Sequence, residues 1–220
     1  MKTLPGEIER ESFSIIREEL RTRGTVLPVE QEAVILRCIH ASADFDYAQT
    51  LHFTPDAVGR GVAAVRNGTP IVTDTNMAKA GISRSGMKKL NGEALCFMAE
   101  PAIAERASTE GTTRAAAAMQ YAAEHLPSAI YAIGNAPTAL FALDGQIRNG
   151  LRPALVIGVP VGFVNVEESK ERIFRTCTEL EIPAIVAMGR KGGSSIAAAI
   201  CNALIYTAAG MLDPAARGWN

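Results

Sequence analysis

The sequence predicts an α/β protein built on a doubly wound, mainly parallel five-stranded sheet with two extra N-terminal helices. Five short apolar runs are spaced along residues 70–188, and helical segments lie between them. Most of these runs are continuously apolar rather than alternating, which is typical of strands covered on both faces. Strand–helix alternation at this density favours right-handed crossovers between parallel strands. A length of 220 residues suits one domain, residues 1–220.

The elements follow in order along the chain. Two helices, at residues 5–23 and 28–42, precede the first strand, so they are not crossovers. They must pack on the outside, reach over an active site or meet a second subunit. The expected strands cover residues 70–74, 93–98, 129–134, 154–159 and 184–188. Further helices are expected at residues 112–125, 136–148, 167–180 and 194–208.

One more helix has a strong start signal. Thr54, Pro55 and Asp56 offer an N-cap hydroxyl, a proline at the first helical position and a carboxylate near the positive end of the dipole. This helix should run to Asn67 and Gly68, where glycine can adopt the left-handed exit conformation.

Composition and charge exclude several classes of protein. The net charge of −1 gives no overall field to attract nucleic acid or an acidic membrane. The N-terminal residues contain no apolar run of signal-peptide type, and the most apolar stretch, residues 154–166, is too short to span a bilayer. Four cysteines lie far apart, which predicts neither a metal site nor disulfides and is typical of reduced thiols in a cytoplasmic protein: Cys38, Cys96, Cys177 and Cys201.

The loops that follow the strands should carry the function, because ligands of such sheets bind beyond the carboxyl ends of the strands. The clearest loop covers residues 189–195. Gly192 and Gly193 expose backbone N–H groups, a helix N-terminus follows, and Arg190 and Lys191 stand beside it. These features together indicate an anion site, although a tight turn with solvated cations is the alternative.

The sequence does not match either of two common phosphate motifs. No strand is followed by G-x-G-x-x-G, and the glycines at 81 and 86 resemble a P-loop in which Met87 replaces the required lysine. A ligand with several carboxylates suits four scattered cations equally well: Arg37, Arg114, Arg190 and Lys191.

Three histidines are candidates for acid–base chemistry. His52 and His125 are interpreted as structural or solvated. His40 lies near the C-terminal end of the second helix, three residues after Arg37, so the two share a face. The helix dipole should favour protonated His40. A partly buried, hydrogen-bonded histidine is the alternative interpretation.

Several blocks of sequence together resemble the precorrin-8X methylmutase family, in order and over nearly the whole chain. They are ERESF (9–13), RCIHA (37–41), DFDY (44–47), PIVTDTNM (70–77), GNAPTALF (134–141), VPVGFVN (159–165), ESK (168–170) and GRKGGS (189–194). The resemblance implies a flavodoxin-like fold and a homodimer with its active site near the subunit interface. It also implies a 1,5-sigmatropic shift that moves a methyl group from C-11 to C-12 of precorrin-8X or cobalt-precorrin-8. The product would be hydrogenobyrinic acid or its cobalt equivalent.

The resemblance also implies roles for individual residues. His40 corresponds to the proton donor, and Ser12 and Arg37 to substrate contacts. The loops and helix starts add the other expected substrate-binding residues: Thr73, Asn76, Arg114, Asn135, Thr138, Gly162, Phe163, Arg190, Lys191, Gly192, Gly193 and Ser194. No cofactor or metal is expected, since a sigmatropic shift needs neither. Ala115 stands where many members have serine, which puts a substrate contact near Arg114 in doubt.

Two other functions fit the same residues. A nucleotide-using enzyme would suit the fold, but its phosphate motifs are missing. A tetrapyrrole carrier would bind the ring through the same loops. The sequence leaves open whether the substrate holds cobalt, how far the N-terminal helices move, and whether the product is channelled to the next enzyme.

Overall fold

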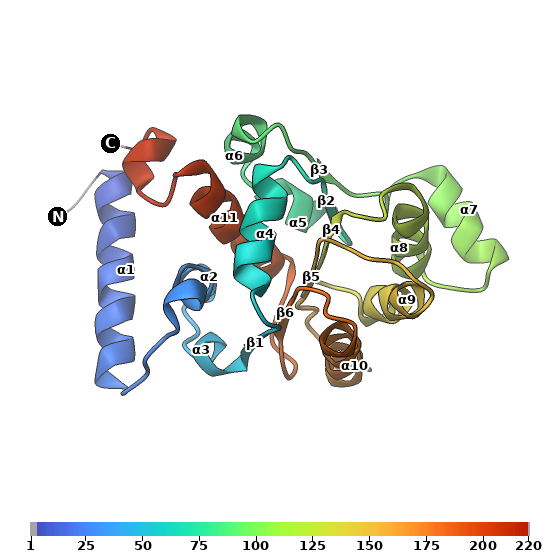
Figure 1. The fold of residues 1–220 in the computed structure, drawn as a ribbon, viewed down its shortest axis with the longest axis horizontal. Coiled ribbons are helices and arrows are strands. Elements are labelled where there is room, and N and C mark those ends of the chain that lie inside the picture. Colours follow the sequence, from blue (N-terminus) through green and yellow to red (C-terminus); the bar gives the residue numbers. More distant parts are fainter. Residues whose placement is uncertain (1–3, 220) are drawn as a thin grey trace.

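The computed structural model describes residues 4–219. Its sheet has six strands in the order β1-β6-β5-β4-β2-β3 (Figure 1). The strands are β1 (Leu51–Phe53), β2 (Ile71–Thr73), β3 (Ala94–Leu95), β4 (Ile130–Ile133), β5 (Leu155–Gly158) and β6 (Ala184–Ala187). Each of the five expected runs forms one of the strands β2 to β6, and these five are mutually parallel.

The expected number of five strands is wrong, because β1 adds an antiparallel edge strand beside β6. Leu51 pairs with Ala187, and Phe53 pairs with Ile185. This strand has only three residues, and a polar histidine stands at its centre. It is therefore too short to show strand periodicity, and its pairing with a segment about 130 residues away defines it.

Helices cover both faces of the sheet, which agrees with a doubly wound arrangement. On β4, Ile130 and Ala132 join one apolar core with residues of α2, α4 and α11. Tyr131 and Ile133 point to the opposite face and join a second core with α7, α8, α9 and α10. Because both faces of each central strand are buried, these strands contain continuous apolar sequence. No helix within residues 4–219 is long and apolar enough to cross a membrane.

The helices are α1 (Pro5–Thr22), α2 (Val29–Ser42), α3 (Tyr47–Thr50), α4 (Ala57–Arg66), α5 (Asn76–Gly81), α6 (Arg84–Lys89), α7 (Pro101–Thr109), α8 (Arg114–His125), α9 (Pro137–Arg148), α10 (Val166–Glu179), α11 (Ser194–Ala209) and the 3-10 helix η1 (Pro214–Arg217). The sequence missed α3, α5, α6, α7 and η1, which have at most nine residues each. Such short helices show too few turns for a clear apolar face.

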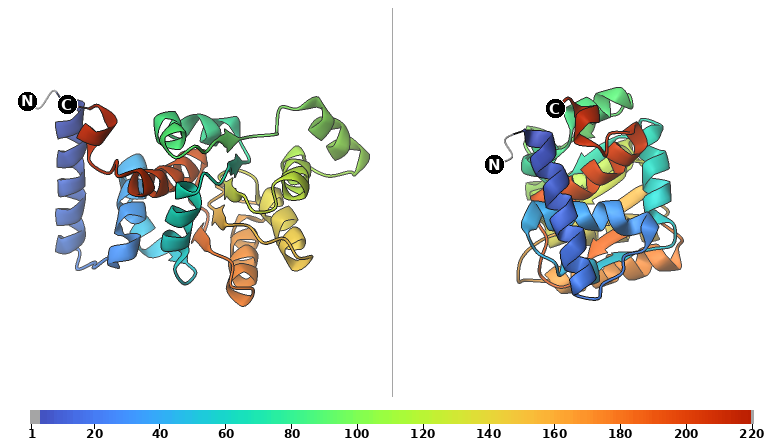
Figure 2. Two further views of the ribbon diagram at one scale, coloured as in Figure 1. Left: turned by 45° about the horizontal axis from the view of Figure 1, so that its top comes forward. Right: turned by 90° about the vertical axis from the view of Figure 1, so that its left-hand side faces the viewer.

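The two N-terminal helices pack outside the sheet, as one of the three expected arrangements requires. The α2 helix lies against α11, while α1 contacts α2 and η1. Figure 1 shows α1 at one end of the molecule and α7 at the other, and Figure 2 shows α1 crossing the end of the body. The helices thus add a third layer at the α11 side of the sheet.

The expected start of the α4 helix is wrong in detail. Thr54 does not cap this helix: its hydroxyl donates to the Ile182 carbonyl (3.2 Å) and accepts from the Ala184 N–H (2.7 Å). The helix begins at Ala57, after Asp56 in the left-handed conformation. The hydroxyl of Thr54 thus hydrogen bonds to residues at the start of strand β6, which lies far away in sequence. The local sequence around Thr54 therefore does not indicate this contact.

Candidate active site

The loops after β2 and β4 meet where the strand order reverses, because β2 and β4 are neighbours in the sheet. Asp74 follows β2 and is buried. Its carboxylate accepts the N–H groups of Gly134 (2.8 Å), Asn135 (2.8 Å) and Ala136 (2.7 Å). Burial raises the pKa of Asp74, and the three donors oppose that rise. The N–H groups before α9 could otherwise bind an anion from solution. The Asp74 carboxylate therefore occupies this site as part of the protein.

The loops after β2, β5 and β6 are also joined to one another. The N–H of Gly193 donates to the Val159 carbonyl (2.8 Å), and the hydroxyls of Thr75 and Ser194 share a hydrogen bond of 2.7 Å. Gly192 has φ +158°, and a Cβ there would lie 2.1 Å from the Val159 oxygen. Only glycine fits this position without moving the loop. The three loops therefore form one connected rim.

Two cations of this rim are paired with carboxylates at the surface. Lys191 Nζ lies 2.7 Å from Asp44 and 2.6 Å from Asp46, and these partners raise the pKa of Lys191. Arg190 lies 3.1 Å from Glu167. Exposed ion pairs of this kind contribute little to stability, because water screens them. Carboxylates of a bound ligand can therefore compete for both cations.

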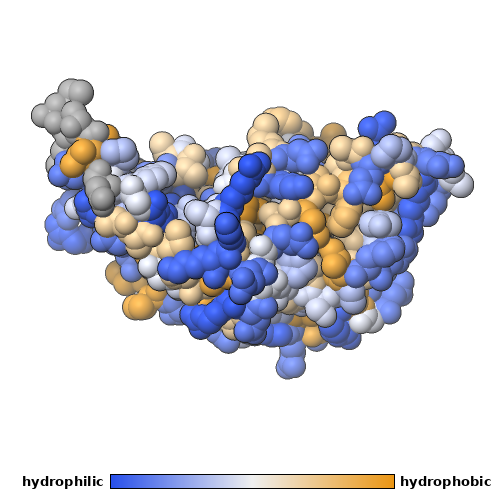
Figure 3. Space-filling view, turned by 90° about the horizontal axis from the view of Figure 1, so that it is seen from above, coloured by the Kyte–Doolittle hydropathy of each residue, from blue (hydrophilic) through white to orange (hydrophobic). Residues whose placement is uncertain are grey.

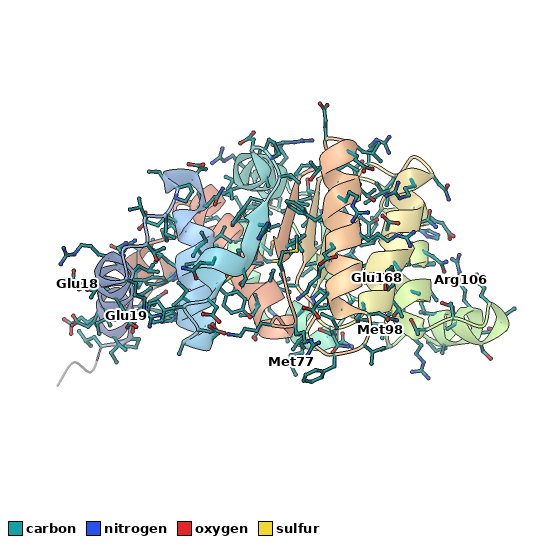
Figure 4. The ribbon with its side chains drawn as sticks, turned by 90° about the horizontal axis from the view of Figure 1, so that it is seen from below. Glu18, Glu19, Met77, Met98, Arg106 and Glu168 are labelled. Carbon is teal, nitrogen blue, oxygen red and sulfur yellow. The ribbon has the colours of Figure 1, made fainter. Side chains whose placement is uncertain are left out.

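Apolar side chains stand exposed on the same rim. Phe163, in the loop after β5, is 83% exposed, and the Arg190 guanidinium lies 5.8 Å from the centre of its ring. Met77, on the first turn of α5, is 73% exposed. Figure 4 shows Met77 projecting at the edge of the molecule where α5 begins. Apolar groups beside cations suit a ligand with a flat apolar ring and a charged periphery.

His40 lies in the last turn of α2 at the protein surface, with one ring face covered. The Phe13 ring of α1 stacks on it with centroids 4.9 Å apart. Partial burial lowers the pKa of His40; Glu9 opposes this shift, and Arg37 and Arg217 add to it. The expectation that the helix dipole would favour the protonated form is wrong, because desolvation and two neighbouring arginines outweigh it.

Arg37 is largely buried rather than open to solvent. Its guanidinium donates to Glu9 (3.0 Å) and lies 5.1 Å from the Phe13 ring centre and 4.9 Å from that of Tyr206. Arg217 pairs with the other oxygen of Glu9. Arg37 therefore joins α1, α2 and α11 through contacts within the protein.

The remaining expected residues lie in three settings. Ser12 donates its hydroxyl to the Ile8 carbonyl (2.8 Å) on α1. Thr73 is buried, and its hydroxyl donates to the Thr75 carbonyl of the rim (3.0 Å) and to the Leu95 carbonyl of β3 (3.1 Å). Thr138 hydrogen bonds Thr113, the cap of α8, and so stands beside Arg114 at the start of that helix. Asn76, Arg114 and Asn135 are exposed, and Gly162 lies in the rim with φ +146°.

The structure thus gathers most of the expected residues on the rim of loops after β2, β4, β5 and β6. The segment after α2 joins this rim through the Lys191–Asp44 pair. Ser12, Arg37 and His40 come instead from the packed pair α1 and α2. Contact between these residues and a substrate stays a prediction.

Two hollows among residues 4–219 lie away from this rim. One of about 450 Å³ is bordered by Lys79, Arg84 and Lys88 of α5 and α6 and by the segment before β3. Figure 3, which looks onto the molecule from the side of α6, shows hydrophilic residues interspersed with hydrophobic ones over that face. A second hollow, of about 470 Å³, lies between α1 and α2 and is bordered by Arg37 and Phe13. His40 lines neither of the two.

Comparison with known proteins decides the family. A sequence model of precorrin-8X methylmutase matches residues 7–207. The chain belongs to the precorrin-8X methylmutase family. The cobalt-precorrin-8 methylmutase of Leptospira interrogans is 42% identical over 92% of this chain and 93% of its own length. The precorrin-8X methylmutase of Pseudomonas aeruginosa is 39% identical over 90% and 93% of the two chains.

A solved structure supports the same family assignment. The precorrin-8X methyl mutase of Thermus thermophilus superposes with a TM-score of 0.82 at 41% identity, over 92% of this chain and 98% of that one. The resemblance seen in the sequence is therefore confirmed, and the protein is an enzyme of the methylmutase class, an isomerase.

Sequence reasoning missed three residues that build the rim. Asp74 and Thr75 belong to the block PIVTDTNM, and Lys170 belongs to the block ESK, but no role was predicted for any of the three. Asp74 was detectable as an acidic residue directly after an apolar strand. Lys170 is fully buried, which no local pattern indicates in a helix as polar as α10.

Proposed function

We propose that this methylmutase moves a methyl group from C-11 to C-12 of precorrin-8X or cobalt-precorrin-8, with His40 as proton donor. The substrate is bound at the rim of loops beyond the carboxyl ends of the strands. The product is hydrogenobyrinic acid or its cobalt-containing equivalent. Family membership supports the reaction class, and the chemistry of the rim supports the kind of ligand.

One observation supports placing donor and substrate together. The Lys191–Asp44 pair holds the anion-binding loop against the segment that follows α2. Asp44 is only four residues after His40 in the chain, which supports a ligand shared by the histidine and the cations of the rim. A macrocycle whose carboxylates bind Arg190 and Lys191 would then bring part of its ring towards the imidazole.

The proposed methyl shift requires the protein mainly to position the substrate and a proton donor. A sigmatropic shift within one molecule requires a held conformation, and positioning of that kind removes several kcal/mol from a barrier. A positioned proton adds roughly 10²–10⁴-fold in rate. His40 is biased towards the neutral form in the free protein. Carboxylates of the bound macrocycle would raise its pKa, so the donor becomes charged mainly when substrate is present.

We further propose that the enzyme is a cytoplasmic homodimer and that residues 1–220 form one flavodoxin-like domain. The parallel strands, counted in chain order, follow the arrangement 2-1-3-4-5 typical of that fold. Ile8 and Ile15 leave an apolar stripe exposed on the outer side of α1. Such a stripe favours contact with a second subunit, in line with the position of α1 outside the sheet.

A carrier that holds the macrocycle without converting it is the second candidate, because the same rim would bind the ring. Turnover separates the two. Conversion of precorrin-8X, followed by visible absorption, should occur with the wild-type protein. Unchanged absorption in the presence of tight product binding would instead identify a carrier.

A further inference from the structure

Lys170 is a charged side chain that lies fully inside the protein. It belongs to the second turn of α10 and is 0% exposed. Its Nζ donates to the carbonyl oxygens of Gly189 (2.7 Å) and Lys191 (2.8 Å). Burying an ammonium group is unfavourable unless its hydrogen bonds are made inside, and here the partners are two carbonyls of one loop. We infer that Lys170 is a positioning residue that shapes the anion-binding loop for the macrocycle carboxylates, an inference that rests on the proposed function.

The geometry of the peptide groups supports this role. In a trans peptide, the C=O and the following N–H point in opposite directions. The two carbonyls point towards Lys170, so the N–H groups of Arg190 and Gly192 point away from it. Within residues 4–219, neither N–H donates a hydrogen bond to another group. Two outward N–H groups beside two cationic side chains form a site for a carboxylate.

The buried charge itself adds to the attraction. Lys170 sits directly beneath the loop, where the low dielectric of the interior screens its field less than water would. Burial lowers the pKa of Lys170 to about 8, and Glu167 on the same helix opposes that shift. The loop above Lys170 contributes the charged side chains of Arg190 and Lys191. Lys191 in turn forms ion pairs with Asp44 and Asp46. The neighbouring strand β6 brings only apolar side chains. Helix α9 brings Asp144 and Arg148, which pair with each other, and Asp144 also pairs with Arg172 further along α10. Strand β1 brings His52, whose ring meets that of Phe174, one turn after Lys170.

These charges fix the sign of the pH dependence. A polycarboxylate bound above Lys170 stabilises the ammonium form and so raises the pKa of Lys170. Binding should then take up protons near pH 8, and the affinity should fall as pH rises towards 9. His40 has a lowered pKa in the free protein, so the proton that it takes up on binding belongs to a lower pH range than that of Lys170 and is still taken up in Lys170→Met. A residue that served only the fold would not couple binding to protons.

Calorimetric titration with hydrogenobyrinic acid tests the inference on the wild-type protein and three variants. Lys170→Met removes charge and donors, and Lys170→Gln keeps a neutral donor. Lys88→Met removes one exposed charge on α6 and serves as the matched control. Titrations at pH 7, 8 and 9, each in two buffers that differ in ionisation enthalpy, report affinity and proton uptake together.

We expect the wild-type affinity to fall by up to about tenfold from pH 7 to pH 9, with proton uptake near pH 8. At pH 7, Lys170→Met should bind about tenfold to a hundredfold more weakly. It should lack the proton uptake near pH 8, and its affinity should change little between pH 7 and pH 9. Lys170→Gln should lie between it and the wild type, and Lys88→Met should match the wild type in affinity and proton uptake.

Proton uptake by the wild type can be measured even if Lys170→Met does not fold, so its absence would overturn the inference by itself. Wild-type affinity or retained proton uptake near pH 8 in Lys170→Met would do the same. In either case the wild type still binds and converts its ligand, so the proposed function would stand. If the wild type bound no hydrogenobyrinic acid, the proposed function would fail and this inference with it.

Discussion

Gly192→Ala should destabilise the protein and disturb the rim, because the residue allows the loops after β5 and β6 to touch. At φ +158°, an added Cβ would lie 2.1 Å from the Val159 oxygen and 2.8 Å from the Pro160 oxygen, and both atoms belong to backbone. The backbone conformation costs a non-glycine residue about 1–3 kcal/mol. Relieving the collision costs about 1–3 kcal/mol more. The free energy of unfolding should therefore fall by about 2–6 kcal/mol.

Gly150→Ala is the matched control. This residue follows α9 at φ +107° and has nothing within 4 Å of an added Cβ, so it carries the backbone cost alone. Urea unfolding of both variants, with m-values compared, measures the difference, which should be about 1–3 kcal/mol. Titration with hydrogenobyrinic acid should show weaker binding in Gly192→Ala only. Equal stability losses and unchanged binding in both variants would refute the packing of the rim described above.

Three other predictions concern charge, pH and assembly. Arg190→Ala and Arg114→Ala should each weaken product binding about tenfold to a hundredfold, and added salt should weaken wild-type binding. His125→Ala, whose ring stacks on Tyr121 at an exposed helix end, should bind normally in the same titration. Burial lowers the pKa of His40 in the free protein, so kcat/KM should begin to fall at a pH below the ordinary histidine pKa of about 6.5. The bound substrate raises the pKa of His40, so kcat should fall only at higher pH. Sedimentation should show a dimer, and a fully active monomer would contradict the proposed assembly.

The sequence predicted what depends on local pattern. The strands β2 to β6 are buried on both faces, so each appeared as an apolar run between glycine, proline and polar residues. The loops after them contained the glycines and cations of the rim. Helices of ten or more residues were also found within a few residues of their ends, because several turns repeat the same apolar face.

The missed features depend on partners that are distant in sequence. Thr54 looks like a helix cap, but its hydroxyl hydrogen bonds to the backbone of Ile182 and Ala184, at the start of strand β6. His40 lies near a helix C-terminus, yet its environment includes Arg217, which folds back from the other end of the chain. In the sequence, Lys170 looks like one more charged residue of a polar helix. Its burial follows from its contacts with the loop after β6, whose carbonyls accept its hydrogen bonds. Tertiary contacts decide each of these cases.

The catalytic role of His40 is the centre of the proposed mechanism, and one comparison tests it most directly. Conversion of precorrin-8X is followed by visible absorption with wild type and His40→Ala, and product affinity is measured on the same samples. His40→Ala should nearly abolish turnover while product affinity stays within about tenfold, since the residue acts on the barrier rather than on binding. Wild-type kcat in His40→Ala would remove this residue from the mechanism.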